Sequence, residues 1–295
     1  MASTKQWIFL VLLALTWGSS FILMKRGLFA PDGSELFSGI QVGAMRIVFA
    51  GLFLSPLALK NIKLLRNGKV WFLLIVGICG NALPAFLFAT AQTHIPSALA
   101  GMLNATVPLF SLIIAYFIFK VKVNKWQITG LFIGLFAAVG LLISSGGTAN
   151  QPVSLGYALL ILVATLCYAI SLNTIKQFLK VESAIAITSL ALLLVSPAGL
   201  IILLSTDFIP RLSANEFALQ GIGAVAILGI VGTALALILF NQLVKDTNTI
   251  FASSVTYLIP LVAIAWGLLD GELVKPSQIT FALIMLGGVL LINRK

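Results

Sequence analysis

The chain is dominated by ten apolar segments of transmembrane length, which are separated by short polar loops. A helix needs about 20 apolar residues to cross a bilayer, whereas a transmembrane β-barrel shows shorter segments of alternating hydrophobicity. We therefore expect an all-α integral membrane protein with ten transmembrane helices. The segments are 7–24, 36–57, 71–89, 97–119, 127–143, 155–174, 184–204, 218–240, 249–269 and 278–292.

Composition excludes an ordinary soluble domain. Hydrophobic residues make up 60% of the chain and charged residues 9%, with a mean hydropathy of +1.12, whereas soluble domains carry about 25% charged residues. The loops leave no room for a soluble catalytic or nucleotide-binding domain, and no glycine-rich phosphate loop is present. The first segment is not interpreted as a signal peptide, because no small-residue cleavage site follows it and nine more apolar segments do.

Basic residues predict the orientation in the membrane. With a cytoplasmic N-terminus, thirteen Lys and Arg residues lie inside and four lie outside, which is the distribution that the positive-inside rule requires. Both termini are then cytoplasmic, in a multi-pass protein of the plasma membrane. The net charge of +10 reflects this topology, so we expect no nucleic-acid partner. The four outside residues are Lys25, Arg26, Arg211 and Lys275.

The second half of the chain repeats the first. Laying Pro260 on Pro108 places Thr256 on Asn104 at an offset of 152 residues, and TWGSSFILMK (16–25) lies over CYAISLNTIK (167–176) at an offset of 151. We interpret residues 1–147 and 148–295 as two five-helix units. Five is odd, so the second unit enters the membrane inverted, and transporters built this way bind substrate near the midplane where the units meet.

The chain resembles the EamA branch of the drug/metabolite transporter superfamily over essentially its whole length. The likeness rests on the two inverted five-helix units, TWGSSF in the first helix, MRIVFAG in the second, and a proline in the fourth and ninth. It implies an exporter or exchanger of small metabolites, often amino acids, that works by alternating access. The implied central cavity is lined mainly by helices 1, 3, 4, 6, 8 and 9.

Polar side chains at membrane depth are the candidate substrate-binding residues, because lipid cannot satisfy them. Small ones such as Ser20 and Ser171 also serve helix packing, and Trp17 and Tyr168 also serve as core aromatics. Pro84, Pro108 and Pro260 are predicted to kink or gate their helices, and Asn81 beside Pro84 also fits a simple kink. The candidates are Trp17, Ser20, Arg46, Asn81, Asn104, Tyr168, Ser171, Asn241, Thr256 and Tyr257.

Asn104 and Pro108 are four residues apart, and so are Thr256 and Pro260. This spacing predicts that each pair shares one helix face. Proline lacks an N–H group, so it also leaves the carbonyl four residues earlier without its helical hydrogen bond. We therefore expect Asn104 and Thr256 on opposite walls of one cavity.

Arg46 is the one charge well inside an apolar segment. A central arginine costs about 2.5–3.5 kcal/mol on insertion scales, so it must be paired or reach the interface. Two interpretations stay open. Arg46 either binds carbonyl groups or a neighbouring helix, or it binds a substrate carboxylate.

All eight Asp and Glu residues fall in loops or at helix ends, which leaves no obvious proton or sodium site in the membrane. We expect facilitated transport or exchange of small neutral or zwitterionic solutes. Phosphorylated sugars fit poorly, because they would require several Lys or Arg residues in the cavity. The acids are Asp32, Glu35, Glu182, Asp207, Glu216, Asp246, Asp270 and Glu272.

Metal, cofactor and enzyme chemistry find little support in the sequence. Cys79 and Cys167 fall inside apolar segments and are interpreted as packing residues, and His94 is the single histidine. We expect no cofactor or metal and no enzyme, because only His94, near a loop, could act as a base. A channel or facilitative pore remains the alternative. The expected partners are a small-molecule substrate and the lipid bilayer, with a homodimer left open.

The orientation is tested by single cysteines at Ser34, Asn67 and Asn150 in a background where Cys79 and Cys167 are serine. A membrane-impermeant maleimide should label positions 34 and 150 in intact cells and should spare position 67. Labelling at position 67 in sealed cells would contradict the orientation.

Overall fold

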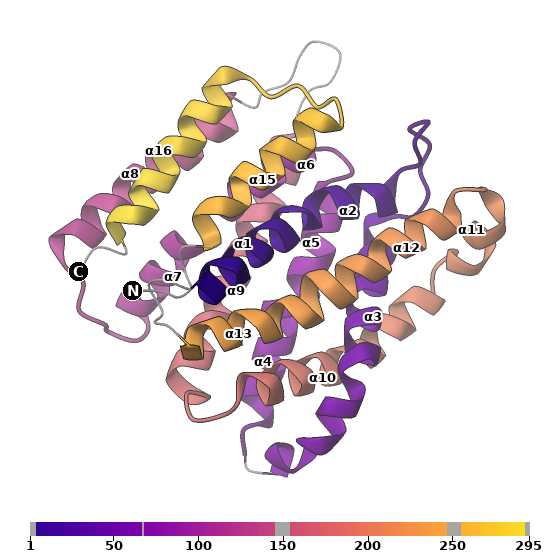
Figure 1. Cartoon of the computed structure of the whole chain (residues 1–295), viewed down its shortest axis with the longest axis horizontal. Coiled ribbons are helices and arrows are strands. Elements are labelled where there is room, and N and C mark those ends of the chain that lie inside the picture. Colours follow the sequence, from indigo (N-terminus) through magenta and orange to yellow (C-terminus); the bar gives the residue numbers. More distant parts are fainter. Residues whose placement is uncertain (1–3, 67, 145–153, 247–254, 293–295) are drawn as a thin grey trace.

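The computed structural model describes residues 4–66, 68–144, 154–246 and 255–292. Figure 1 shows a bundle of helices, and within the described residues the only β-type pairing is an isolated bridge between Phe29 and Glu35. The expected all-helical architecture is confirmed for this part of the chain. The boundary between the two proposed units, at 147, lies outside the described residues.

Within the described residues, eight helical stretches are long and apolar enough to cross a membrane. Two shorter apolar helices follow them, namely α15 (Val255–Leu269) and α16 (Pro276–Ile292). Residues 249–254 of the predicted ninth segment lie outside the described residues. The eight stretches are α1 (Thr4–Gly18) with α2 (Ser20–Leu28), α3 (Gly39–Lys60), α4 (Val70–Gly77) with η2 (Ile78–Ala82) and α5 (Leu83–Ala91), α6 (Ser97–Asn104) with α7 (Val107–Phe117), α8 (Lys125–Ser144), α9 (Leu155–Phe178), α10 (Ala184–Leu204), and α12 (Ala218–Gly229) with η3 (Ile230–Leu235) and α13 (Ala236–Asp246). Short helices η1 (Ile62–Arg66) and α11 (Phe208–Ala214) lie in connections.

The fourth segment is not one helix, so the prediction that Asn104 and Pro108 share a helix face is wrong. Helix α6 ends at Asn104 and α7 begins at Val107. Pro108 cannot donate to the Asn104 carbonyl, and the chain instead closes tight turns there, with Thr106 N donating to Leu103 O at 3.0 Å. Pro260, by contrast, lies buried inside a continuous α15.

Helices α8 and α16 lie side by side (Figure 1), and close contacts among Gly130, Gly134 and Gly288 join them. A Cβ built on Gly288 would lie 2.7 Å from both Gly130 O and Gly134 N. A similar close approach joins α3 to α10, where Gly51 faces Ser196. In lipid such contacts replace the hydrophobic effect as the main source of helix association.

The first helix of each half packs mainly on the other half of the chain. Helices α1 and α2 contact α12, α13 and α15, which all come from the second half. Conversely, α9 contacts α4, η2, α5 and α7 from the first half. This exchange brings residues far apart in the sequence into contact, for example Trp17 and Gly232, which are 215 residues apart.

At the end of the bundle predicted to face outside, buried acids join three segments. The Glu272 carboxylate accepts hydrogen bonds from Ser97 N and Ala98 N, both at 2.9 Å, at the N-terminus of α6. It also pairs with Lys25 at 2.8 Å. Asp270 pairs with Lys25 at 2.6 Å and with Arg26. These acids lie outside the apolar helices, as expected. Ion pairs and backbone hydrogen bonds hold both of them in place.

The α8–α16 contact yields a matched pair of substitutions. Gly288→Ala should lower the thermal midpoint, because its Cβ meets backbone, and overpacking typically costs about 1–3 kcal/mol. Gly287→Ala is the control on the same helix, since a Cβ there meets nothing within 4 Å. Equal thermal midpoints for the two purified variants would contradict this packing.

Candidate functional site

Two π-helical turns interrupt long apolar helical stretches, η2 between α4 and α5 and η3 between α12 and α13. Turn η2 begins at Ile78 and η3 begins at Ile230, which is 152 residues later (230 − 78). Each contains a glycine followed by a polar residue, Gly80-Asn81 in η2 and Gly232-Thr233 in η3. π-Turns are rare and occur frequently at functional sites, so these two turns are where we place the candidate site.

The polar residue in each π-turn makes the same hydrogen bond. Asn81 Nδ2 donates to Val76 O at 3.3 Å, and Thr233 Oγ1 donates to Leu228 O at 3.2 Å. In both cases the acceptor is the carbonyl five residues earlier. A widened turn displaces backbone groups from their regular helical partners, and lipid offers no replacement. Asn81 and Thr233 therefore stabilise the turns that they occupy.

The glycine in each π-turn packs against the first-helix serine of the other half. A Cβ on Gly80 would lie 2.4 Å from Ser171 Oγ, and a Cβ on Gly232 would lie 3.1 Å from Ser20 Oγ. Both serines are buried, and Ser20 Oγ donates to Thr16 O at 3.1 Å. The structure thus gives both serines a packing position directly beside the π-turns.

Trp17 and Tyr168 occupy matching places in the two first helices, but their contacts differ. Trp17 Nε1 donates to Gly232 O in η3 at 3.1 Å, and its ring lies 5.3 Å from that of Phe240. Tyr168 packs on Phe88, with ring centroids 6.1 Å apart. Trp17 therefore binds the backbone of a π-turn, whereas Tyr168 packs as a core aromatic.

Arg46 also reaches η3. Its Nε donates to Thr233 Oγ1 at 3.1 Å, and a Cβ on Gly229 would lie 2.8 Å from Arg46 O, so α3 passes close to the start of η3. Across the described residues no carboxylate lies within 4.0 Å of the guanidinium. Trp17, Ser20, Arg46, Gly232 and Thr233 form one group, which we call the η3 cluster.

The remaining predicted residues are more scattered. Asn104 is half-buried at the end of α6, and its amide has no hydrogen bond within the described part of the chain. Tyr257 Oη donates to Val289 O of α16 at 3.3 Å, so it ties two helices together. Thr256 is half-buried in the first turn of α15, and the side chain of Asn241 in α13 lies outside what the structure describes. Pro84 lies in the first turn of α5, which follows η2 directly.

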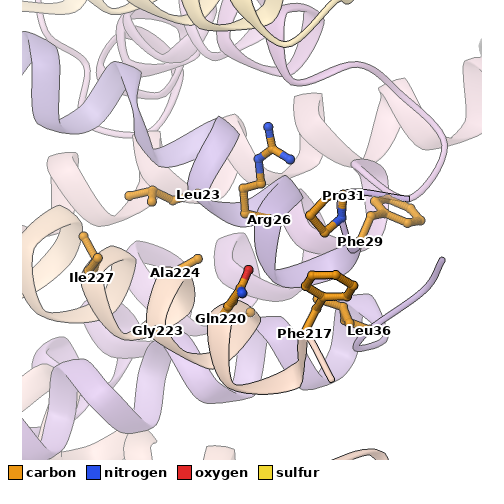
Figure 2. Close-up of a pocket in the computed structure, with 11 residues that line it drawn as sticks. Leu23, Arg26, Phe29, Pro31, Leu36, Phe217, Gln220, Gly223, Ala224 and Ile227 are labelled. Carbon is orange, nitrogen blue, oxygen red and sulfur yellow. The ribbon is translucent and has the colours of Figure 1, made fainter. Parts of the chain in front are cut away.

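A pocket of about 400 Å³ lies between α2 and α12 near the end predicted to face outside, away from the η3 cluster. Figure 2 shows Arg26 and Gln220 among apolar neighbours that include Leu23, Phe29, Phe217 and Ile227. None of the predicted substrate-binding residues lines this pocket. No three His, Cys, Asp or Glu side chains gather into a metal site in the residues that the structure covers.

Sequence reasoning missed the π-turns. The signal was present, because ICGNAL (78–83) and IVGTAL (230–235) align at the same offset of 152 that relates the two prolines. Reading them together would have identified Gly232 and Thr233 as counterparts of Gly80 and Asn81.

A rescue experiment tests the π-turn contact. Gly80→Ala should destabilise the protein by about 1–3 kcal/mol, because its Cβ falls 2.4 Å from Ser171 Oγ. Adding Ser171→Gly should recover most of the loss in thermal midpoint. Additive losses in the double variant would show that the two residues do not meet.

Comparison with known proteins identifies the family. The model of the EamA-like transporter family matches the chain twice, over residues 5–143 and 155–294. Protein PagO of Salmonella typhimurium is 28% identical over 260 residues, covering 88% of this chain and 82% of PagO. The inner membrane transporter YedA of Escherichia coli is 28% identical over 269 residues, covering 88% of this chain and 81% of YedA.

Two further similarities extend over nearly all of the chain. A probable terminal-alkyne amino-acid exporter of Streptantibioticus cattleyicolor is 24% identical over 292 residues, covering 97% of this chain and 92% of the exporter. A crystal structure with 16% identity superposes with a TM-score of 0.63, covering 98% of this chain and 96% of the other, and shows the shared fold. The chain belongs to the EamA-like transporter family.

Proposed function

We propose that this protein is a secondary transporter of the plasma membrane that exports small polar metabolites, amino acids or related compounds, by alternating access. Its family is a family of transporters, and one relative is named as a probable amino-acid exporter. Inner membrane transporters among the relatives support the location. We keep the predicted cytoplasmic position of both termini as part of the proposal.

The matched π-turns carry the proposal. We infer that residues 1–147 and 148–295 are inverted five-helix repeats, and that α15 and α16 complete a set of ten spans. Support comes from two turns 152 residues apart, each stabilised by its own polar side chain and packed on a serine from the other half. Two related turns in opposite orientations supply a pair of hinges on either side of one central site.

Arg46 gives the site its specificity in this proposal. Thr233 engages only Nε, so the two terminal amino groups of the guanidinium remain able to bind a carboxylate through parallel hydrogen bonds. No acid of the described chain neutralises the guanidinium within 4.0 Å. Asn104, with its unengaged amide, is a second contact for a zwitterion such as an amino acid.

A two-stage experiment tests the function. An export screen that compares metabolites released by cells with and without the protein should enrich carboxylate-bearing solutes. The best candidate is then tested by counterflow in proteoliposomes, where a carrier transiently accumulates labelled substrate against its gradient. Rapid equilibration without a transient would favour the channel instead, and the absence of any solute flux would contradict transport.

Arg46 substitutions separate recognition from folding. Arg46→Lys retains the charge but loses the planar fork, so the purified variant should keep its yield while affinity for carboxylate substrates falls about 10- to 100-fold, as for loss of a charged hydrogen bond. Thr233→Val is the comparison variant, because it removes the bonds to Arg46 Nε and Leu228 O but keeps the guanidinium. It should lower the thermal midpoint and reduce substrate affinity less than Arg46→Lys does. If Arg46→Lys binds substrate normally but melts earlier, Arg46 is structural.

A further inference from the structure

The two cysteines of the chain lie on two elements that pack against each other. Cys79 lies in η2, and Cys167 lies in α9, which packs against η2. Cys79 adjoins Gly80, which packs against Ser171 of α9, and Cys167 lies one helical turn before Ser171, so the two side chains are neighbours. Cys167 is buried, whereas Cys79 is partly exposed, and both are free thiols. They are 88 residues apart in the sequence (167 − 79).

The backbone geometry around the pair explains how the thiols meet. Gly80, the neighbour of Cys79, has no side chain, and a Cβ there would lie 2.4 Å from Ser171 Oγ and 3.1 Å from Ser171 Cβ. Ser171 follows Cys167 by one helical turn, on the same face of α9. The π-turn and α9 therefore approach closely, and a disulfide needs such an approach, with Cα atoms usually about 4.4–6.8 Å apart.

Two cysteines placed at random in the chain would rarely be neighbours. A buried residue typically touches about 6–12 others, so two randomly chosen positions among the 295 residues meet roughly one time in thirty. The positions equivalent to Cys79 and Cys167 in the other half are Val231 (79 + 152) and Thr16 (167 − 151). A thiol pair is thus present beside only one of the two π-turns.

We propose that Cys79 and Cys167 form a redox pair that closes reversibly to a disulfide. Both S–H bonds break and one S–S bond forms, with loss of two protons and two electrons. A small neutral two-electron oxidant such as diamide accepts them, and its N=N bond is reduced to a hydrazine. Cys79, which is the more exposed of the two, reacts first, and the Cys167 thiolate then displaces the oxidant from its sulfur.

The disulfide ties η2 to α9 and so fixes the turn that holds Asn81. The consequence for activity rests on the proposed function. If η2 is a hinge of the transport cycle, a bond between this turn and α9 should arrest transport, and reduction should restore it. Only the hinge in the first half is fixed, because Val231 and Thr16 cannot form the equivalent bond.

The test treats the purified full-length protein in proteoliposomes with diamide and measures intact mass and thiols that react with maleimide after denaturation. We expect a loss of two mass units and of both reactive thiols, a cross-linked peptide that contains both cysteines, and full reversal by dithiothreitol. Cys167→Ser should prevent the link. The double variant Leu166→Cys with Cys167→Ser, which moves the thiol to an exposed neighbouring position, should prevent it as well.

The outcomes separate the chemistry from the transport proposal. If both thiols still react with maleimide after diamide treatment, or if each gains oxygen without forming a link, the redox pair is overturned. This assay needs no substrate. Once a substrate is known, oxidised wild-type protein should transport it at least about tenfold more slowly than reduced wild-type protein. Transport by Cys79→Ser should not change on diamide treatment. A quantitative disulfide with unchanged transport would overturn the arrest.

Discussion

The structure depends on one constraint, which is that a polar group inside the membrane must find its partner within the protein. At the two π-turns the backbone departs from regular helical bonding, and in each the turn's own polar side chain binds the carbonyl five residues earlier. The indole of Trp17 and the guanidinium of Arg46 add bonds to η3 from α1 and α3. At both turns, polar side chains therefore supply hydrogen bonds to a backbone that departs from regular helical bonding.

Close backbone packing makes these contacts possible. Gly80 and Gly232 allow the first helix of each half to press its serine onto the π-turn of the other half. The same principle joins α8 to α16 through Gly130, Gly134 and Gly288. Small residues thus set the distances between helices, and the distances decide which polar groups meet. The Cys79–Cys167 contact follows from one of these approaches.

Sequence reasoning predicted the helices well, because uninterrupted apolar runs allow few alternatives to membrane helices. The segment 184–204 coincides with α10, and most others agree within a few residues. The same reasoning failed at the break after Asn104. A proline is compatible with both a kinked and a broken helix, and what accompanies the break here is a distant contact, Thr106 Oγ1 with Thr165 Oγ1 of α9 at 2.9 Å.

The candidate site was only partly predictable for the same reason. Four residues were predicted because they are polar and lie in apolar segments, namely Trp17, Ser20, Arg46 and Asn81. The structure places all four at or beside a π-turn. It could not show that Arg46 meets Thr233, or that Tyr257 binds α16, because those partners lie 187 and 32 residues away. Hydropathy also gives no sign of a π-turn, since the turn changes hydrogen bonding without changing composition.

Alternation of access to the central site is the claim on which the account rests. The most direct measurement replaces Asn104 with cysteine in a functional cysteine-free background and follows labelling by a membrane-impermeant reagent in right-side-out and inside-out vesicles. The account predicts labelling from both sides, with substrate gradients that raise the rate from one side and lower it from the other. Labelling from one side only, or rates that rise together on both sides, would contradict it.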